Sequence, residues 1–171
     1  MNNEFSLQNL KFSDAFKKAR IPGKTALILS TWFGTGLAPK MPGTIGSLAA
    51  IPLVAALTYL GAVYVGIALV VLVPLAVWSS HFSSTLLKKK DPSEIVIDEV
   101  AGLLLTLFLL PLSWTTILSG FVFFRFFDIL KPFPVGWADK RFSGGIGIVL
   151  DDLLAGIYGN ICVRFLLLFL Y

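Results

Sequence analysis

The sequence contains almost no cysteine and almost no histidine. Its 171 residues include one of each, Cys162 and His81. A single cysteine cannot close an internal disulfide, and zinc sites in proteins are built mainly from cysteine and histidine ligands. The chain must therefore fold without a disulfide of its own, and a metal site in it would have to use oxygen ligands, which Mg²⁺ prefers.

Charged residues are also scarce. They make up 14% of the chain, whereas hydrophobic residues make up 56%, more than a soluble domain usually contains. This balance is typical of an integral membrane protein, and an unusually apolar helical globule is the alternative. The net charge of +4 suits an anionic membrane surface. No basic run is interleaved with aromatic residues, so we expect no nucleic-acid partner.

Apolar stretches occupy most of the chain after a polar and basic lead, residues 1–24, which is too long and too polar for a secretory signal peptide. We expect residues 25–171 to form one domain. A hydrocarbon core of about 30 Å needs about 20 helical residues, and the stretches that approach this length are 48–60, 61–87, 95–112, 114–130 and 148–171. The predicted fold class is all-α: a multi-span helical membrane protein, a compact helix bundle with three to five spans.

Basic residues lie in alternate connections between these stretches. They precede the first stretch, recur at Lys88–Lys90, and recur again over Lys131–Arg141, whereas the connections near 61–64 and 111–115 carry none. Under the positive-inside rule, all three basic connections face the cytoplasm in a five-span arrangement. Arg164, near the far end of the last stretch, is the exception, and we expect it to snorkel or to face another helix.

Acidic residues repeat one pattern, in "IVIDEVAG" (Ile95–Gly102) and "IVLDDLLAG" (Ile148–Gly156). Each pair opens a helix that leaves the cytoplasmic side, and polar groups inside an apolar chain tend to mark function. Carboxylates gathered at this membrane depth would repel one another unless a cation lay among them. An all-oxygen set favours Mg²⁺ or Mn²⁺ over zinc, and a proton or Na⁺ site is the alternative. The candidate ligands are Asp98, Glu99, Asp128, Asp151 and Asp152.

Cationic and glycine-rich segments beside these acids indicate an anionic ligand. Arg125 and Lys131 flank Asp128 at three-residue spacing, on one helix face. Two glycine-rich loops precede helices, whose first N–H groups bind phosphate well, although each loop alone fits an ordinary tight turn. Together with the acids they predict a phosphate site at the cytoplasmic end of the bundle. The candidate loop residues are Thr44 and Ser47 in the first loop, and Gly144 and Gly145 in the second.

Four longer segments occur in a fixed order: "GTGLAPKMPGTIGSLAAIPL" (Gly34–Leu53), "IVIDEVAG", "FRFFDILKPFP" (Phe124–Pro134) and "SGGIGIVLDDLLAG" (Ser143–Gly156). In these segments the chain resembles the phosphatidylglycerophosphatase A family, magnesium-dependent membrane phosphatases of bacterial phosphatidylglycerol synthesis. The resemblance implies a multi-pass protein of the bacterial cytoplasmic membrane. It also implies that the chain removes the terminal phosphate of the phospholipid phosphatidylglycerophosphate, giving phosphatidylglycerol. The oligomeric state stays open.

Other phosphatase chemistries do not fit the sequence. A cysteine phosphatase needs an arginine six residues after its nucleophile, but Leu168 stands six residues after Cys162. A histidine phosphatase needs paired histidines, and the acids here are adjacent rather than arranged as Asp-x-Asp. Metal-assisted hydrolysis remains, with the five acids holding one or two ions. We expect Glu99 or Asp152 to orient the attacking water, and Arg125 and Lys131 to stabilise the phosphate.

Two further functions are alternatives. A phosphatidyltransferase that acts on CDP-linked lipids would also use membrane carboxylates and Mg²⁺, but its "DGxxAR" run is absent. A small cation transporter would use intramembrane carboxylates without hydrolysing a substrate. Release of phosphate from a lipid phosphomonoester separates the phosphatase from both.

Overall fold

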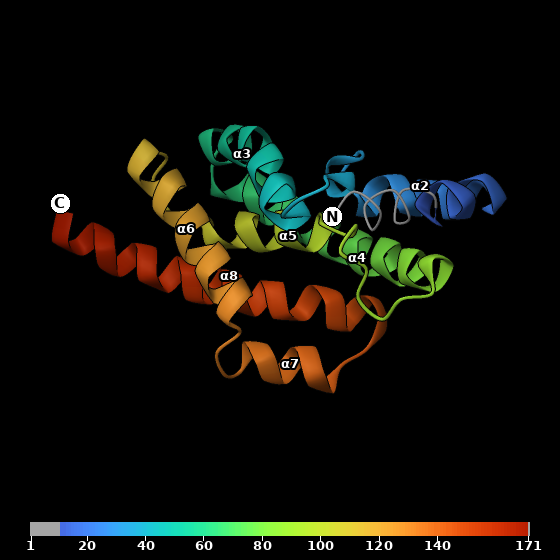
Figure 1. Cartoon of the computed structure of the whole chain (residues 1–171). Coiled ribbons are helices and arrows are strands. Elements are labelled where there is room, and N and C mark those ends of the chain that lie inside the picture. The colour runs from blue at the N-terminus through green and yellow to red at the C-terminus, as the bar shows by residue number, and fades with distance from the viewer. Residues whose placement is uncertain (1–10, 171) are drawn as a thin grey trace.

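The structure, a computed structural model, describes residues 11–170 (Figure 1). Residues 1–10 of the predicted lead and Tyr171 of the last predicted stretch lie outside this range. Within it the chain contains helices and no strand, so the all-α prediction is confirmed. Residues 11–18 are helical, and the elements that follow are α2 (Ile21–Ser30), the 3₁₀ helix η1 (Thr35–Leu37), α3 (Pro42–Leu60), α4 (Ala62–Leu87), α5 (Ile97–Thr106), α6 (Trp114–Leu130), α7 (Val135–Arg141) and α8 (Gly144–Leu170).

Three of the described helices, α3, α4 and α8, are long and apolar enough to cross a membrane. The predicted stretch 95–112 does not form a span, because α5 has 10 residues and would extend only about 15 Å at 1.5 Å per residue. The predicted stretch 114–130 forms α6, which has 17 residues and is not among the three candidate spans. The five-span arrangement is therefore replaced by three candidate spans, the lower limit of the predicted range. In Figure 1, α6 turns back from the end of α5 toward the middle of the molecule. The two helices form a hairpin, so the basic connections before α5 and after α6 can still share one side.

The end of α5 is fixed by two side chains from α8. The Asn160 amide donates to the carbonyls of Thr106 and Phe108, at 2.8 Å each. Arg164 donates to the carbonyls of Phe108 and Leu109 and to the Asn160 side-chain oxygen. The last carbonyls of a helix have no partner within the helix, and in an apolar environment each unpaired group is costly. Arg164 therefore contacts the turn that follows α5, near the end of that helix.

Replacing Asn160 with leucine should destabilise the protein, because the carbonyls of Thr106 and Phe108 lose this donor. We expect the free energy of unfolding to fall by about 1–3 kcal/mol, measured as a lower thermal midpoint in detergent. Ile161→Ala is the matched control, since the neighbouring Ile161 side chain is 43% exposed. Equal midpoints for the two variants would contradict the capping role.

The crossing of α5 and α8 brings the two helix backbones into contact at glycines. A Cβ atom on Gly102 would lie 2.7 Å from the carbonyl oxygen of Asp152, and one on Gly156 would lie 2.5 Å from the carbonyl oxygen of Gly102. Gly102 follows Asp98 by four residues and Gly156 follows Asp152 by four, so each glycine shares a helix face with an acid. The repeated acid–glycine pattern thus has a physical cause: the glycines let the helices approach, and the acids of both helices then meet.

Candidate functional site

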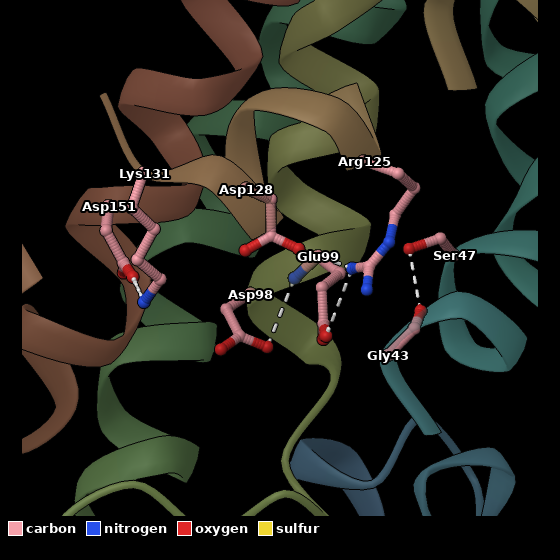
Figure 2. A network of polar contacts seen from close by, with 8 residues as sticks. All are labelled: Gly43, Ser47, Asp98, Glu99, Arg125, Asp128, Lys131 and Asp151. Atoms are coloured by element: carbon pink, nitrogen blue, oxygen red, sulfur yellow. Dashed lines mark hydrogen bonds and ion pairs between the residues drawn. The ribbon is translucent and has the colours of Figure 1, made fainter. Parts of the chain in front are cut away.

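The five predicted acids converge on one cavity of about 330 Å³. Figure 2 shows four of them, Asp98, Glu99, Asp128 and Asp151, with Arg125 and Lys131 between α5, α6 and α8. The acids come from the first turn of α5, the last turn of α6 and the third turn of α8. The cavity is lined by Met41, Pro42, Gly43, Thr44, Asp91, Pro92, Ser93, Ile95, Asp98, Glu99, Arg125, Asp128, Ile129, Lys131, Ile148, Asp151 and Asp152.

Three of the acids lie close enough together that they could hold a metal ion. One carboxylate oxygen from each of Asp98, Glu99 and Asp152 lies within 4.8 Å of the other two. Asp98 is 7% exposed and Asp152 is 4% exposed, so their mutual repulsion is poorly screened by water. Glu99 Oε2 is buried and has no hydrogen-bond partner among the described residues. A buried, all-oxygen donor set with an unpaired lone pair fits a hard divalent cation such as Mg²⁺.

Arg125 joins α5 and α6 at the cavity wall. Its Nη1 pairs with Asp128 Oδ2 on the same helix and lies 3.5 Å from Glu99 Oε1 (Figure 2). Its Nε is buried and has no partner among residues 11–170, so the guanidinium retains a donor. Gly43 makes room for this ion pair, because a Cβ atom there would overlap Glu99 Oε1.

Lys131 ends α6 and reaches α8. Its Nζ lies 2.6 Å from Asp151 Oδ2 and 3.2 Å from Asp139 Oδ1 of α7. Burial by itself would lower the pKa of Lys131, but the hydrogen bond and the charge of Asp151, with the charge of Asp139, raise this pKa above its ordinary value. Lys131 is therefore protonated at neutral pH. Asp151 Oδ1 is buried and has no hydrogen-bond partner in the described part of the chain.

Two acids beside this cavity were not predicted from the sequence. Asp91 lines the cavity, and partial desolvation by the surrounding protein raises the pKa of its carboxyl group; Lys131 opposes this rise, whereas Asp139 and Asp128 add to it. Asp139 contacts Lys131. Asp91 stands in "KKKDPSE" and Asp139 in "GWADKR". Both segments are polar connections, in which a carboxylate is expected to be solvated. Only the folded chain places them here.

The predicted phosphate-binding loop residues separate into two groups. Thr44 lines the cavity, whereas the buried Ser47 hydroxyl donates to the Gly43 carbonyl at 2.8 Å (Figure 2). Gly144 and Gly145 do not line this cavity. A Cβ atom on Gly145 would overlap the Val77 carbonyl oxygen of α4, and one on Gly144 would lie 3.0 Å from His81 Nδ1. These two glycines therefore permit close packing of α8 on α4, one to two turns away from Asp151.

The chain is similar in sequence to known proteins over most of its length. The family model described as Phosphatidylglycerophosphatase A matches residues 28–167. A Phosphatidylglycerophosphatase A of Escherichia coli (strain K12) is 38% identical over 131 residues, which are 76% of this chain and 76% of that protein. A Phosphatidylglycerophosphatase A of Haemophilus influenzae (strain ATCC 51907 / DSM 11121 / KW20 / Rd) is 41% identical over 138 residues, 80% of this chain and 85% of that protein.

This chain belongs to the phosphatidylglycerophosphatase A family. The resemblance drawn from the four sequence segments is thus confirmed, and the chain is an enzyme that hydrolyses a phosphate monoester. A third relative, from Bacteroides thetaiotaomicron, is named "Putative phosphatidylinositol-3-phosphatase" and is 34% identical over 150 residues, 83% of this chain and 93% of that protein. No solved structure matches the chain.

Proposed function

We propose that this phosphatidylglycerophosphatase A family member hydrolyses phosphatidylglycerophosphate to phosphatidylglycerol and phosphate with Mg²⁺, or Mn²⁺, at the cavity between α5, α6 and α8. We further propose that it works in the bacterial cytoplasmic membrane with this cavity toward the cytoplasm. The observation that carries the proposal is the meeting of five acids, Arg125 and Lys131 at one cavity. Family membership favours hydrolysis over the transferase and the transporter.

Asp98, Glu99 and Asp152 are the residues that would hold the metal, because their oxygens lie closest together. A bound divalent ion would neutralise phosphate oxygens and lower the pKa of a water molecule. Asp128 has a different part: it holds the Arg125 guanidinium on the same helix. This division makes Asp98, Glu99 and Asp152 direct ligands, and Asp128 a residue that positions a cation.

The phosphate would be bound by cations and by the start of α3. Arg125 retains an unpaired Nε, and a guanidinium has five donors in a planar fork. The Thr44 hydroxyl lies at the same cavity, in the first turn of α3, where helix N–H groups have no intrahelical partner. Acyl chains would stay outside, because 330 Å³ is near the lower end of the roughly 300–1,000 Å³ of small-molecule sites.

We assign to Asp151 the proton of the attacking water. Lys131 holds Asp151 Oδ2, whereas Oδ1 has no partner among the described residues. Oδ1 would accept the proton as the water oxygen bonds to phosphorus. Asp151 would then return this proton to the ester oxygen as the phosphorus–oxygen bond breaks, leaving a hydroxyl on the lipid. From the sequence we expect Glu99 or Asp152 to orient this water, and the acid that accepts its proton stays open. Both residues lie in the three-acid cluster, so we assign the proton to Asp151.

Removal of the metal should abolish the activity. We expect the purified full-length protein in detergent to release phosphate from phosphatidylglycerophosphate. This release should stop in excess EDTA and should resume when Mg²⁺ is restored. Phosphate is measured colorimetrically. Release that continues unchanged in EDTA would contradict metal-assisted hydrolysis.

The same assay tests the headgroup. Phosphatidylinositol 3-phosphate is the second substrate, because one relative carries that name, and phosphatidic acid is the third. We expect phosphatidylglycerophosphate to give the largest kcat/KM. A larger value for either other lipid would overturn the proposed substrate while leaving the phosphatase chemistry intact.

A further inference from the structure

The exposed residues that line the mouth of the cavity are of two unlike kinds. Met41 and Ile129 line the cavity, and each is 64% exposed. Asp91 and Ser93 also line the cavity and are exposed, but they lie in the polar connection that follows Lys88–Lys90. We refer to Met41 and Ile129 as the apolar side of the mouth, and to Asp91 and Ser93 as the polar side.

The apolar side lies directly beside the groups proposed to bind phosphate. Met41 precedes the first turn of α3, which carries Thr44. Ile129 follows Arg125 by four residues, so the two share a face of α6. A ligand that reached Arg125 and Thr44 from this side would pass over two apolar side chains.

Exposed apolar surface continues outward from this side. Phe126, Leu130 and Phe133, at the end of α6 and just beyond it, are 52%, 61% and 79% exposed. Contiguous exposed apolar residues mark contact with a membrane or another protein. In a chain with three helices long enough to span a bilayer, lipid is the occupant that agrees with both this surface and the cations inside the mouth.

We propose that Met41 and Ile129 form a lateral gate through which an anionic lipid carrying a phosphate monoester enters the cavity from the bilayer, while the Asp91 and Ser93 side opens to water and releases inorganic phosphate. This proposal rests on the proposed function and names how its substrate is selected. The headgroup contacts the cations inside, and the first part of the acyl chains packs against the two apolar side chains. The gate therefore favours lipid phosphates over soluble phosphates of the same headgroup.

A double variant, Met41→Asn with Ile129→Gln, tests the gate. Asparagine tolerates the left-handed backbone of Met41, whose φ is 49°, and glutamine is a good helix former. The substrates are dipalmitoyl phosphatidylglycerophosphate in mixed micelles and its deacylated headgroup in solution. We expect the ratio of kcat/KM for the lipid to kcat/KM for the headgroup to fall at least tenfold, mainly through the KM for the lipid. Leu118→Gln is the matched control, because Leu118 lies on the same helix, is 67% exposed and does not line this cavity.

An unchanged ratio in the double variant, or an equal fall in Leu118→Gln, would overturn the gate. A second measurement does not depend on turnover. It uses nitroxide spin labels attached in a Cys162→Ala background, with the protein in bilayers. Oxygen, which concentrates in lipid, should increase the relaxation rate of labels at positions 41 and 129. A water-soluble nickel chelate should increase the relaxation rate of a label at position 91. Labels at 41 and 129 that respond to nickel as position 91 does would also overturn the gate. If the labels at 41 and 129 lie in lipid but the unmodified protein releases no phosphate, the result contradicts the proposed function and supports the gate.

Discussion

Asp98→Asn and Asp152→Asn should each reduce phosphate release from the lipid substrate by roughly 10³-fold. Loss of a single preorganised group that stabilises charge in a transition state costs about 10²–10³-fold, and these residues would also hold the metal. Both side chains are buried in the three-acid cluster, so asparagine keeps the shape and removes the charge. The measurement is kcat/KM with Mg²⁺, together with Mn²⁺ binding followed by electron paramagnetic resonance.

Asp14→Asn is the matched control for these variants. Asp14 is exposed and lies in the helical segment 11–18, and it does not line the cavity. We expect its activity and its Mn²⁺ binding to equal those of the unmodified protein. An Asp98→Asn or Asp152→Asn protein with unreduced turnover would remove that residue from the mechanism.

Gly156→Ala should destabilise the protein and also reduce activity. Its Cβ would lie 2.5 Å from the Gly102 carbonyl oxygen, which is backbone and cannot rotate away. Overpacking of this kind costs about 1–3 kcal/mol, and the shift of α8 that relieves it would separate Asp152 from Asp98. We expect a lower thermal midpoint in detergent and at least a tenfold lower kcat/KM for the lipid.

Gly66→Ala is the control for this substitution. Gly66 lies inside α4, and its added Cβ would meet only Phe108 Cε2, at 3.9 Å. Alanine is the better helix former by about 1 kcal/mol, so the midpoint should stay equal or rise. If Gly156→Ala also left the midpoint and the activity unchanged, the glycine contact would not be what aligns the acids.

The acid–glycine repeat shows how far the sequence alone can lead. Two adjacent acids followed by Ala-Gly, in two apolar segments, predicted that both segments contribute to one polar site. The prediction was possible because charge in an apolar helix is costly and because residues four apart share a face. The role of the glycines was not predicted, since a close approach of two backbones depends on which helices cross.

Two differences between the sequence predictions and the structure have a similar origin. After Asp98 and Glu99 the stretch up to residue 112 is almost entirely apolar. Only the structure shows that α5 ends at Thr106, where the Asn160 amide binds the Thr106 carbonyl. The "SGGIG" segment has the composition of a phosphate loop, yet Gly145 packs against Val77 of α4. In both cases local composition allows two structures, and a partner distant in sequence selects one.

The sequence by itself determined the fold class, the family, and the oxygen-rich chemistry of the site, because hydrophobic content, residue type and local spacing are properties of the chain. Tertiary structure decided which carboxylates share a cavity and which of them pair with Arg125 or Lys131. It also added Asp91 and Asp139 to the site. These are contacts between segments distant in sequence, so they are fixed only when the helices cross and backbones meet at Gly102 and Gly156.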